Sequence, residues 1–196
     1  EEGTSDKKGE VYNWVIDPLD GTTNFIHGLT PHSISVALME GNEVVLGVVY
    51  EISHSEMFYA YKGGGAFLNG APISVTTHAE HQQALIATGF PYYAFNKMDA
   101  YLSCMKEIME KASGVRRLGS AAIDLCYVAC GKFEAFWEYG LHPWDVAAGA
   151  FIIQQAGGRV SDFWGEGNYL FNGEIIAANS FYFNKFYEIV NKHLGS

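Results

Sequence analysis

Apolar positions in the first half of the chain recur with the spacing of β-strands. Residues 33–39 alternate between apolar and polar side chains, and a turn at Gly41-Asn42 leads into an apolar run at 44–50. This pattern predicts a β-hairpin. The glycines at 63–65 are expected to form another hairpin turn. Further strands are expected at 11–17, 56–61 and 84–90, so the first half is predicted to be rich in antiparallel sheet.

In the second half the apolar spacing changes to that of helices. Met98, Leu102 and Met105 lie one helical turn apart, charged residues occupy the opposite side, and Gly114 follows as a stop signal. Further helices are expected at 120–130, 145–156 and 183–194, and strands at 133–139, 159–161 and 174–178. Strands and helices thus occur in separate runs rather than in strict alternation, which favours a layered α+β architecture.

Length and composition are those of a globular chain. The 196 residues are 48% hydrophobic and 17% charged, which argues against intrinsic disorder, and the length is that of one ordinary domain or two small ones. No apolar run approaches the roughly 18 residues of a membrane span, so we expect a soluble protein with no membrane partner. Three cysteines are too few for a disulfide framework, which points to a reducing, cytoplasmic compartment. Cys126 and Cys130 lie in an apolar segment and are expected in the core.

The charge balance is acidic. The formal net charge is −10, and no basic cluster exceeds the pairs Lys7-Lys8 and Arg116-Arg117. The electrostatic surface that nucleic acids or anionic membranes require is therefore missing, and neither is an expected partner. A chain this acidic that handles an anionic ligand needs metal ions or helix N-termini to offset its own field.

The sharpest local feature is residues 17–24, DPLDGTTN, where the first expected strand ends. Two carboxylates three residues apart, Asp17 and Asp20, are joined by a bend that a proline stiffens. They can converge on one or two hard cations while the Leu19 carbonyl supplies another oxygen. This is the outline of a Mg²⁺ site.

The same segment offers a place for an anion. Gly21 lets the backbone approach a ligand closely, and Thr22 or Thr23 can cap a helix whose free N–H groups face a phosphate. Metal and phosphate would then meet at one place. The alternative that the residues leave open is an Asp-Gly turn followed by a helix cap, without any ligand.

A second polar segment, residues 137–145 (WEYGLHPWD), runs from an expected strand into a helix start. Asp145 is placed as an ordinary helix N-cap, but paired with the first segment it offers a third carboxylate. Glu138 is either a solvated charge at a strand edge or an acceptor for the hydroxyl groups of a polyol. The spacing alone leaves both alternatives open for each residue.

Residues 14–25 (WVIDPLDGTTNF) and 144–149 (WDVAAG) resemble the two signature motifs of the inositol monophosphatase family of Mg²⁺-dependent, lithium-sensitive sugar phosphatases. Residues 62–70, 117–122 and 156–160 also resemble segments of this family, so the match covers almost the whole chain and implies a single catalytic domain over residues 1–196. The resemblance implies a layered αβαβα sandwich, usually a homodimer, which agrees with the layered α+β prediction.

The resemblance also implies roles for individual residues. Thr22, Asp17 and Asp20 would be catalytic, with Thr22 helping to activate the attacking water, and two or three Mg²⁺ ions would be the cofactor. The implied metal ligands are Glu1, Asp17, the Leu19 carbonyl, Asp20 and Asp145. The implied substrate contacts are Gly21 and Thr22 at the phosphate, Gly119, Ser120, Ala121 and Glu138 at the sugar or inositol hydroxyls, and Asp145.

The start of the chain departs from the family pattern. Two N-terminal helices, and the aspartate that partners the activating threonine, have no counterpart in these residues, and the loop from Glu1 to Asp17 is shorter than in many relatives. The assignment of Glu1 rather than Glu2 stays open. The chain also begins without a Met, so we expect either a longer natural protein or a catalytically impaired chain.

The implied function is Mg²⁺-dependent hydrolysis of a phosphate monoester of inositol or a related sugar or polyol. Relatives with fructose-1,6-bisphosphatase, histidinol-phosphatase or 3′(2′),5′-bisphosphate nucleotidase activity are the enzymatic alternatives. The run GTTNF at 21–25 resembles the inositol phosphatase branch more than the nucleotidase branch. A different class of function, a metal- and phosphate-binding relative without turnover, is the remaining alternative.

Overall fold

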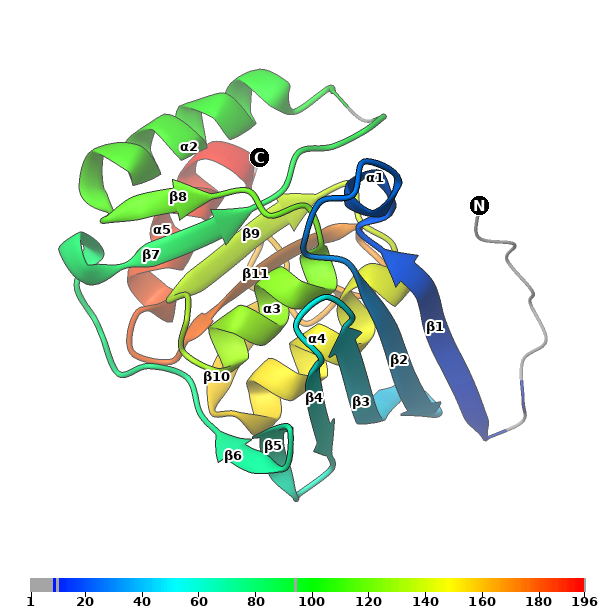
Figure 1. The fold of residues 1–196 in the computed structure, drawn as a ribbon. Helices are drawn as coiled ribbons and strands as arrows, with labels where there is room; N and C mark the ends of the chain where they lie inside the picture. The colour runs from blue at the N-terminus through cyan, green and yellow to red at the C-terminus, as the bar shows by residue number, and fades with distance from the viewer. Residues whose placement is uncertain (1–8, 10, 94, 196) are drawn as a thin grey trace.

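The computed structural model describes residues 9, 11–93 and 95–195, and these form two β-sheets. The first sheet has six strands in chain order, each antiparallel to the next (Figure 1). Its strands are β1 (Tyr12–Asp20), β2 (Ser33–Glu40), β3 (Glu43–Glu51), β4 (Glu56–Tyr61), β5 (Gly65–Leu68) and β6 (Ala71–Ile73). The predicted hairpin at 33–50 and the predicted turn at 63–65 are confirmed.

The second sheet has five strands in the order β10-β11-β9-β7-β8. Strand β7 is parallel to both β8 and β9, whereas β11 is antiparallel to β9 and β10. The strands are β7 (Leu85–Thr88), β8 (Gly114–Arg116), β9 (Ala135–Tyr139), β10 (Gly158–Ser161) and β11 (Glu174–Asn179). Strand β9 lies at the centre of the sheet, and all five of its residues are buried.

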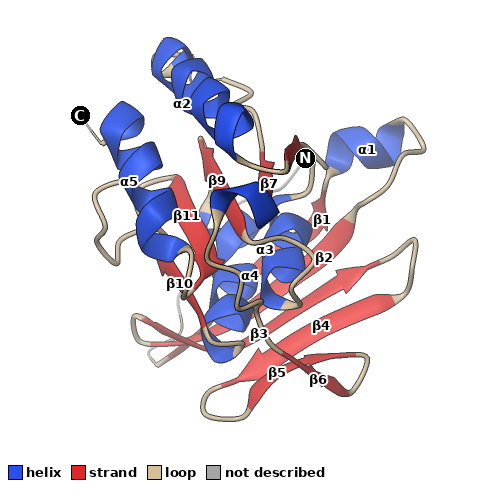
Figure 2. Cartoon of the chain, turned by 90° about the vertical axis from the view of Figure 1, so that its left-hand side faces the viewer, coloured by secondary structure: helices blue, strands red, loops and turns tan. Residues whose placement is uncertain are grey.

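The helices form layers on the sheets. Helices α3 and α4 are apolar on nearly every side and lie between the two sheets, while α2 and α5 cover the other face of the second sheet (Figure 2). Apolar side chains fill one core on each side of that sheet. The helices are α1 (Thr22–Ile26), α2 (Met98–Lys111), α3 (Ala121–Ala129), α4 (Pro143–Gln155) and α5 (Phe183–Leu194), with a 3-10 turn η1 (His81–Gln83). The α+β layered architecture is confirmed.

The outer face of the six-stranded sheet carries apolar side chains. Tyr12, Trp14 and Ile16 alternate along β1 on this face, and Trp14 is 60% exposed. None of the helices in the described ranges covers the face (Figure 2). The described residues therefore supply four of the five expected layers.

A few elements differ from the sequence-based expectations. The strand expected at 84–90 ends at Thr88, and the helix expected from Asp145 begins two residues earlier, at Pro143. The short strands β6 and β8 were not predicted, because three residues are too few for a periodic signal. Cys126 is buried in the core as expected, and Cys130 is partly buried. In the described ranges, no helix is long and apolar enough to span a membrane.

Candidate metal and phosphate site

The end of strand β1 turns two carboxylates toward the same side of the sheet. Asp17 pairs with Ser35 and Asp20 pairs with Ser33, so β1 has one more residue than β2 between these pairs. In a regular strand, residues three apart would face opposite sides. The irregularity in pairing restores the alternation, and both aspartates are buried on the inner face.

The third carboxylate comes from the start of helix α4. His142 is the N-cap and Pro143 the first helical residue, which makes Asp145 the third. The Asp145 Oδ2 atom accepts a hydrogen bond of 2.7 Å from the His142 N–H. Asp145 is therefore not the N-cap itself. Asp17, Asp20 and Asp145 each place a carboxylate oxygen within 4.8 Å of those of the other two.

This cluster is electrostatically costly without a cation. Burial and, to a smaller extent, the charge of Asp17 raise the pKa of Asp20 to about 6, although hydrogen bonds from Ser120, Ala122 and Gly21 oppose the shift. The Ser120 hydroxyl donates to Asp20 Oδ2 at 2.5 Å and the Ala122 N–H donates to it at 2.9 Å. Three converging carboxylates are hard oxygen donors whose repulsion a divalent cation relieves, so the residues fit a metal ion such as Mg²⁺.

The raised pKa of Asp20 makes a pH dependence predictable. The folded chain binds the Asp20 carboxyl proton more tightly than the unfolded chain does. Without metal, the free energy of unfolding should therefore fall by up to about 3 kcal/mol as the pH rises from 3.8 to about 6. Mg²⁺ needs the ionised carboxylate, so its stabilising effect should grow over the same interval. We expect added Mg²⁺ to raise the Tm much more at pH 7.5 than at pH 5. Equal shifts at both pH values would contradict this, and Asp20→Asn should remove most of the difference.

Residues that follow Asp20 form a tight corner beside the cluster. Gly21 has φ 82° and is the N-cap of α1, so neither Thr22 nor Thr23 is the cap. A side chain at Gly21 would stand 3.0 Å from the Pro31 carbonyl oxygen and 3.2 Å from that of Gly119. The Thr22 hydroxyl donates to the Leu19 carbonyl at 2.8 Å. This corner thus brings the 17–22 segment against residue 119.

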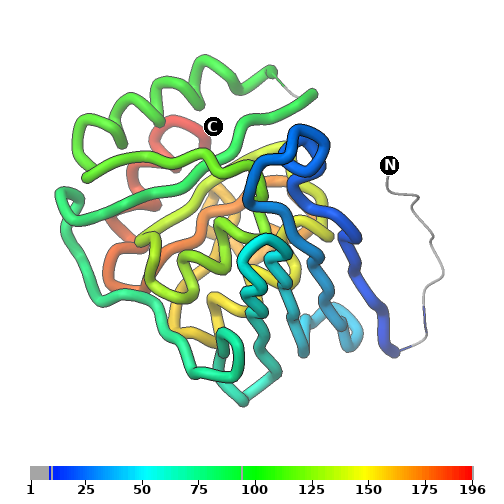
Figure 3. The backbone as a smooth tube through the Cα atoms, viewed as in Figure 1, coloured from blue at the N-terminus to red at the C-terminus, as the bar shows by residue number. Residues whose placement is uncertain are grey.

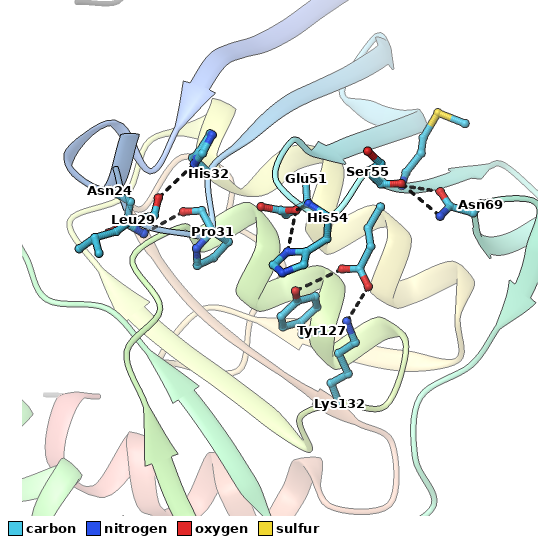
Figure 4. Close-up of polar contacts among 12 residues, drawn as sticks. Asn24, Leu29, Pro31, His32, Glu51, His54, Ser55, Asn69, Tyr127 and Lys132 are labelled. Atoms are coloured by element: carbon cyan, nitrogen blue, oxygen red, sulfur yellow. Dashed lines mark hydrogen bonds and ion pairs between the residues drawn. The ribbon is translucent and has the colours of Figure 1, made fainter. Parts of the chain in front are cut away.

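Asn24 joins the same two segments. Its buried amide donates to the carbonyls of Pro31 and Leu118, at 2.8 Å each, and Figure 4 shows Asn24 turned toward Pro31. Figure 3 shows the end of β1 and the stretch before α3 side by side, although they are far apart in the chain. The only sign of Asn24 in the sequence is that it is a polar residue inside the first motif. The sequence does not show which groups it bonds to.

A second buried acidic group lies next to the cluster. Glu138 on β9 is 8% exposed, and its pKa is raised well above 4.5 by burial and by the charges of Asp20 and Asp145. The alternative that Glu138 is a solvated charge at a strand edge is therefore wrong. Asp124 on α3 is also buried, its pKa is raised by burial and by Glu138, and Arg117 opposes both shifts. Among the described residues, no hydrogen-bond partner reaches Asp124 Oδ1.

Two residues near Glu138 were missed by sequence reasoning. Asp124 had a signal, because it is the one charged residue in the apolar segment 121–129. Gly89 had none. A Cβ atom built on Gly89 would lie 2.0 Å from the Glu138 carboxylate carbon, so the absence of a side chain there makes room for the carboxylate. Both residues shape the surroundings of Glu138.

The remaining predicted site residues lie around this centre. Gly119 has φ 91° and precedes Ser120, the N-cap of α3, whose side chain is occupied by Asp20 and by a 3.4 Å bond from the Ile123 N–H. Ala121 opens α3 and is buried. Glu1 and Glu2 lie outside the described residues.

The chain matches known proteins over nearly its full length. The model of the inositol monophosphatase family matches residues 1–194. A Neisseria meningitidis serogroup B protein named "Putative Nus factor SuhB" is 43% identical over 99% of this chain and 74% of its own length. An "Inositol-1-monophosphatase" of Mesorhizobium japonicum is 41% identical over 91% of this chain and 67% of its own.

Solved structures agree with the sequence matches. The crystal structure of extragenic suppressor protein suhB from Bartonella henselae superposes with a TM-score of 0.90 at 38% identity, covering 94% of this chain and 70% of that one. A family match over almost every residue, together with a shared fold and relatives above 40% identity, leaves one assignment. The chain belongs to the inositol monophosphatase family.

Proposed function

We propose that this protein is a Mg²⁺-dependent phosphatase that hydrolyses a phosphate monoester of inositol or a related polyol. The observation that carries the proposal is the convergence of three aspartate carboxylates beside the Gly21-Thr22 corner. Family membership supports a phosphatase in general. The proposal extends to lithium sensitivity, a homodimer and a cytoplasmic location, which rest on the resemblance and on the cysteine content.

Each part of the reaction has a candidate group in this chain. Asp17, Asp20, Asp145 and the Leu19 carbonyl would hold the cations, with Glu1 as a further proposed ligand. Bound Mg²⁺ supplies a more acidic water and offsets negative charge on the phosphate. The Thr22 hydroxyl donates its hydrogen bond to the Leu19 carbonyl, so the hydroxyl oxygen is left to accept a hydrogen bond from the attacking water and orient it.

The other end of the substrate would meet the surface around Glu138. We assign the phosphate to Gly21 and Thr22, and the hydroxyl groups to Glu138 and the backbone of residues 119–121. Because the Ser120 hydroxyl already donates to Asp20, its main chain is the part left for the substrate. Glu138 is buried and forms no ion pair with the described residues, which favours a ligand rich in hydroxyl groups.

Gly89→Ala tests the role of Glu138 without touching the carboxylate itself. The new methyl group would collide with the Glu138 side chain and displace it. Since a buried group that loses its hydrogen-bond partner costs about 1–3 kcal/mol, we expect kcat/KM to fall roughly 5- to 100-fold, mainly through KM. Mg²⁺ affinity from calorimetry should stay unchanged. A normal KM would show that Glu138 does not contact the substrate.

The direct test of the proposal is release of inorganic phosphate from inositol 1-phosphate, with and without Mg²⁺. Fructose 1,6-bisphosphate, histidinol phosphate and adenosine 3′,5′-bisphosphate should be assayed in parallel, because they distinguish the enzymatic alternatives. We expect turnover only with Mg²⁺ and fastest with a polyol monophosphate. Faster turnover of adenosine 3′,5′-bisphosphate would place the chain in the nucleotidase branch instead.

A second candidate is a regulatory role without turnover. Its support is that similar proteins carry the name "Nus factor SuhB". The cluster of three aspartates fits both candidates, because each of them binds a metal ion, so phosphate release is what distinguishes them. Mg²⁺ binding without any phosphate release from the four substrates would favour this second candidate.

A further inference from the structure

Two buried serines on β2 face the same interior as the aspartate cluster. Ser33 is 0% and Ser35 is 1% exposed, and they pair directly with Asp20 and Asp17 across the strands. Directly paired residues lie on one face with their side chains in contact range. The next inward residue of β2 is Ala37, which is fully buried in the apolar core. The inner face of β2 therefore becomes hydroxyl-bearing only where it approaches the carboxylates.

Ser35 reaches the helix that carries the third aspartate. Its hydroxyl donates to the Trp144 carbonyl at 3.1 Å, across 109 residues of sequence. Trp144 directly precedes Asp145 in the first turn of α4. This hydrogen bond ties the start of α4 to the sheet position opposite Asp17. It thereby fixes the place of the Asp145 backbone relative to Asp17.

Ser33 reaches Asp20 through a second serine. The Ser33 and Ser120 hydroxyl oxygens are 3.4 Å apart, and Ser120 donates to Asp20 Oδ2 at 2.5 Å. An ionised carboxylate only accepts hydrogen bonds, so the single Ser120 proton is committed to Asp20. Ser33 must then be the donor to Ser120. The two hydrogen bonds therefore run in one direction, from Ser33 to Ser120 and from Ser120 to Asp20, and they fix the orientation of the Asp20 carboxylate.

We propose that Ser33 and Ser35 are positioning residues that hold Asp20 and Asp145 in the arrangement that, with Asp17, binds the metal ions. Ser35 acts on Asp145 through the Trp144 carbonyl, and Ser33 acts on Asp20 through Ser120. The inference rests on the proposed function, because it concerns the same cations. Removing a group that orients a metal ligand in this way typically lowers metal affinity or activity 10- to 100-fold.

The test is calorimetric titration of Mg²⁺ into the metal-free chain, with thermal unfolding recorded without metal. Ser35→Ala and Ser33→Ala should each weaken Mg²⁺ binding about tenfold. Ser161→Ala is the matched control. Ser161 is a buried strand serine that donates to the Asp162 carbonyl at 2.8 Å in the second sheet. It should show a similar loss of Tm and unchanged Mg²⁺ affinity.

A double-mutant cycle separates positioning from general stability. If Ser35 acts through Asp145, then Ser35→Ala should have little further effect on Mg²⁺ affinity in an Asp145→Asn background. Unchanged affinity in both serine variants, or the same tenfold loss in Ser161→Ala, would overturn the inference while wild-type binding still supports the proposed function. Failure of the wild-type chain to bind Mg²⁺ would overturn the proposed function and the inference with it.

Discussion

Asp145→Asn should reduce Mg²⁺ affinity about 100-fold and kcat/KM by roughly 10² to 10³, or about 3–4 kcal/mol. The change keeps the shape of the side chain, and the asparagine oxygen can still accept the His142 N–H. It removes one of the three charges that attract the cations. Calorimetric titration with Mg²⁺ and phosphate-release kinetics at several Mg²⁺ concentrations measure the two effects.

In the absence of metal, Asp145→Asn should not lower the thermal stability. The negative charge of Asp145 raises the pKa of the buried Glu138, so removing it relieves repulsion. The metal-free Tm of Asp145→Asn at pH 7.5 should therefore equal or exceed that of the wild type. Asp162→Asn is the control, since Asp162 is also buried and accepts N–H groups but lies outside the cluster. It should lower the Tm and leave Mg²⁺ affinity unchanged; the same pattern in Asp145→Asn would contradict the assigned role.

Thr22→Ala should lower kcat about 100-fold, because the hydroxyl that orients the attacking water is lost. Mg²⁺ affinity and KM should change little, since Thr22 is proposed to touch the water through its side chain and the phosphate through its backbone. The residue is exposed at the start of α1, so the free energy of unfolding should stay within about 0.5 kcal/mol of wild type. Steady-state kinetics at saturating Mg²⁺ give kcat and KM separately.

Two further variants sharpen the result at Thr22. Thr22→Ser keeps the hydroxyl and its bond to Leu19, so it should retain most of the rate. Thr23→Ala removes an exposed hydroxyl from the next residue of α1 and should be nearly neutral. Equal losses in Thr22→Ala and Thr22→Ser would mean that the hydroxyl is not the active part of the residue.

Much of the fold was predictable because the apolar spacing is strong along most of the chain. The hairpin at 33–50 and the long helices were predicted from periodicity, and the largely apolar segment at 121–129 proved to be a helix between two sheets. The three aspartates were chosen as acidic residues at the ends of strands and helices. Their convergence follows from the family resemblance and from chemistry rather than from local sequence.

What the sequence could not show depends on contacts between distant segments. The irregular pairing in β1 is visible only once Asp17 and Asp20 are aligned with β2. The role of Asn24 needs the position of Leu118, and that of Gly89 needs the position of the Glu138 carboxylate. Such details come from tertiary packing, which no local pattern of residue types encodes.

Asp17, Asp20 and Asp145 are proposed to hold the catalytic cations together, and metal localisation in crystals tests this most directly. Mn²⁺ is a suitable probe because it favours the same oxygen ligands and scatters X-rays anomalously. Crystals of this chain soaked in Mn²⁺ should show anomalous density in contact with oxygen atoms of all three aspartates, and Asp145→Asn crystals should show weaker density there. Phosphate release that depends on Mn²⁺, from a protein whose anomalous density lies away from these three residues, would contradict the claim.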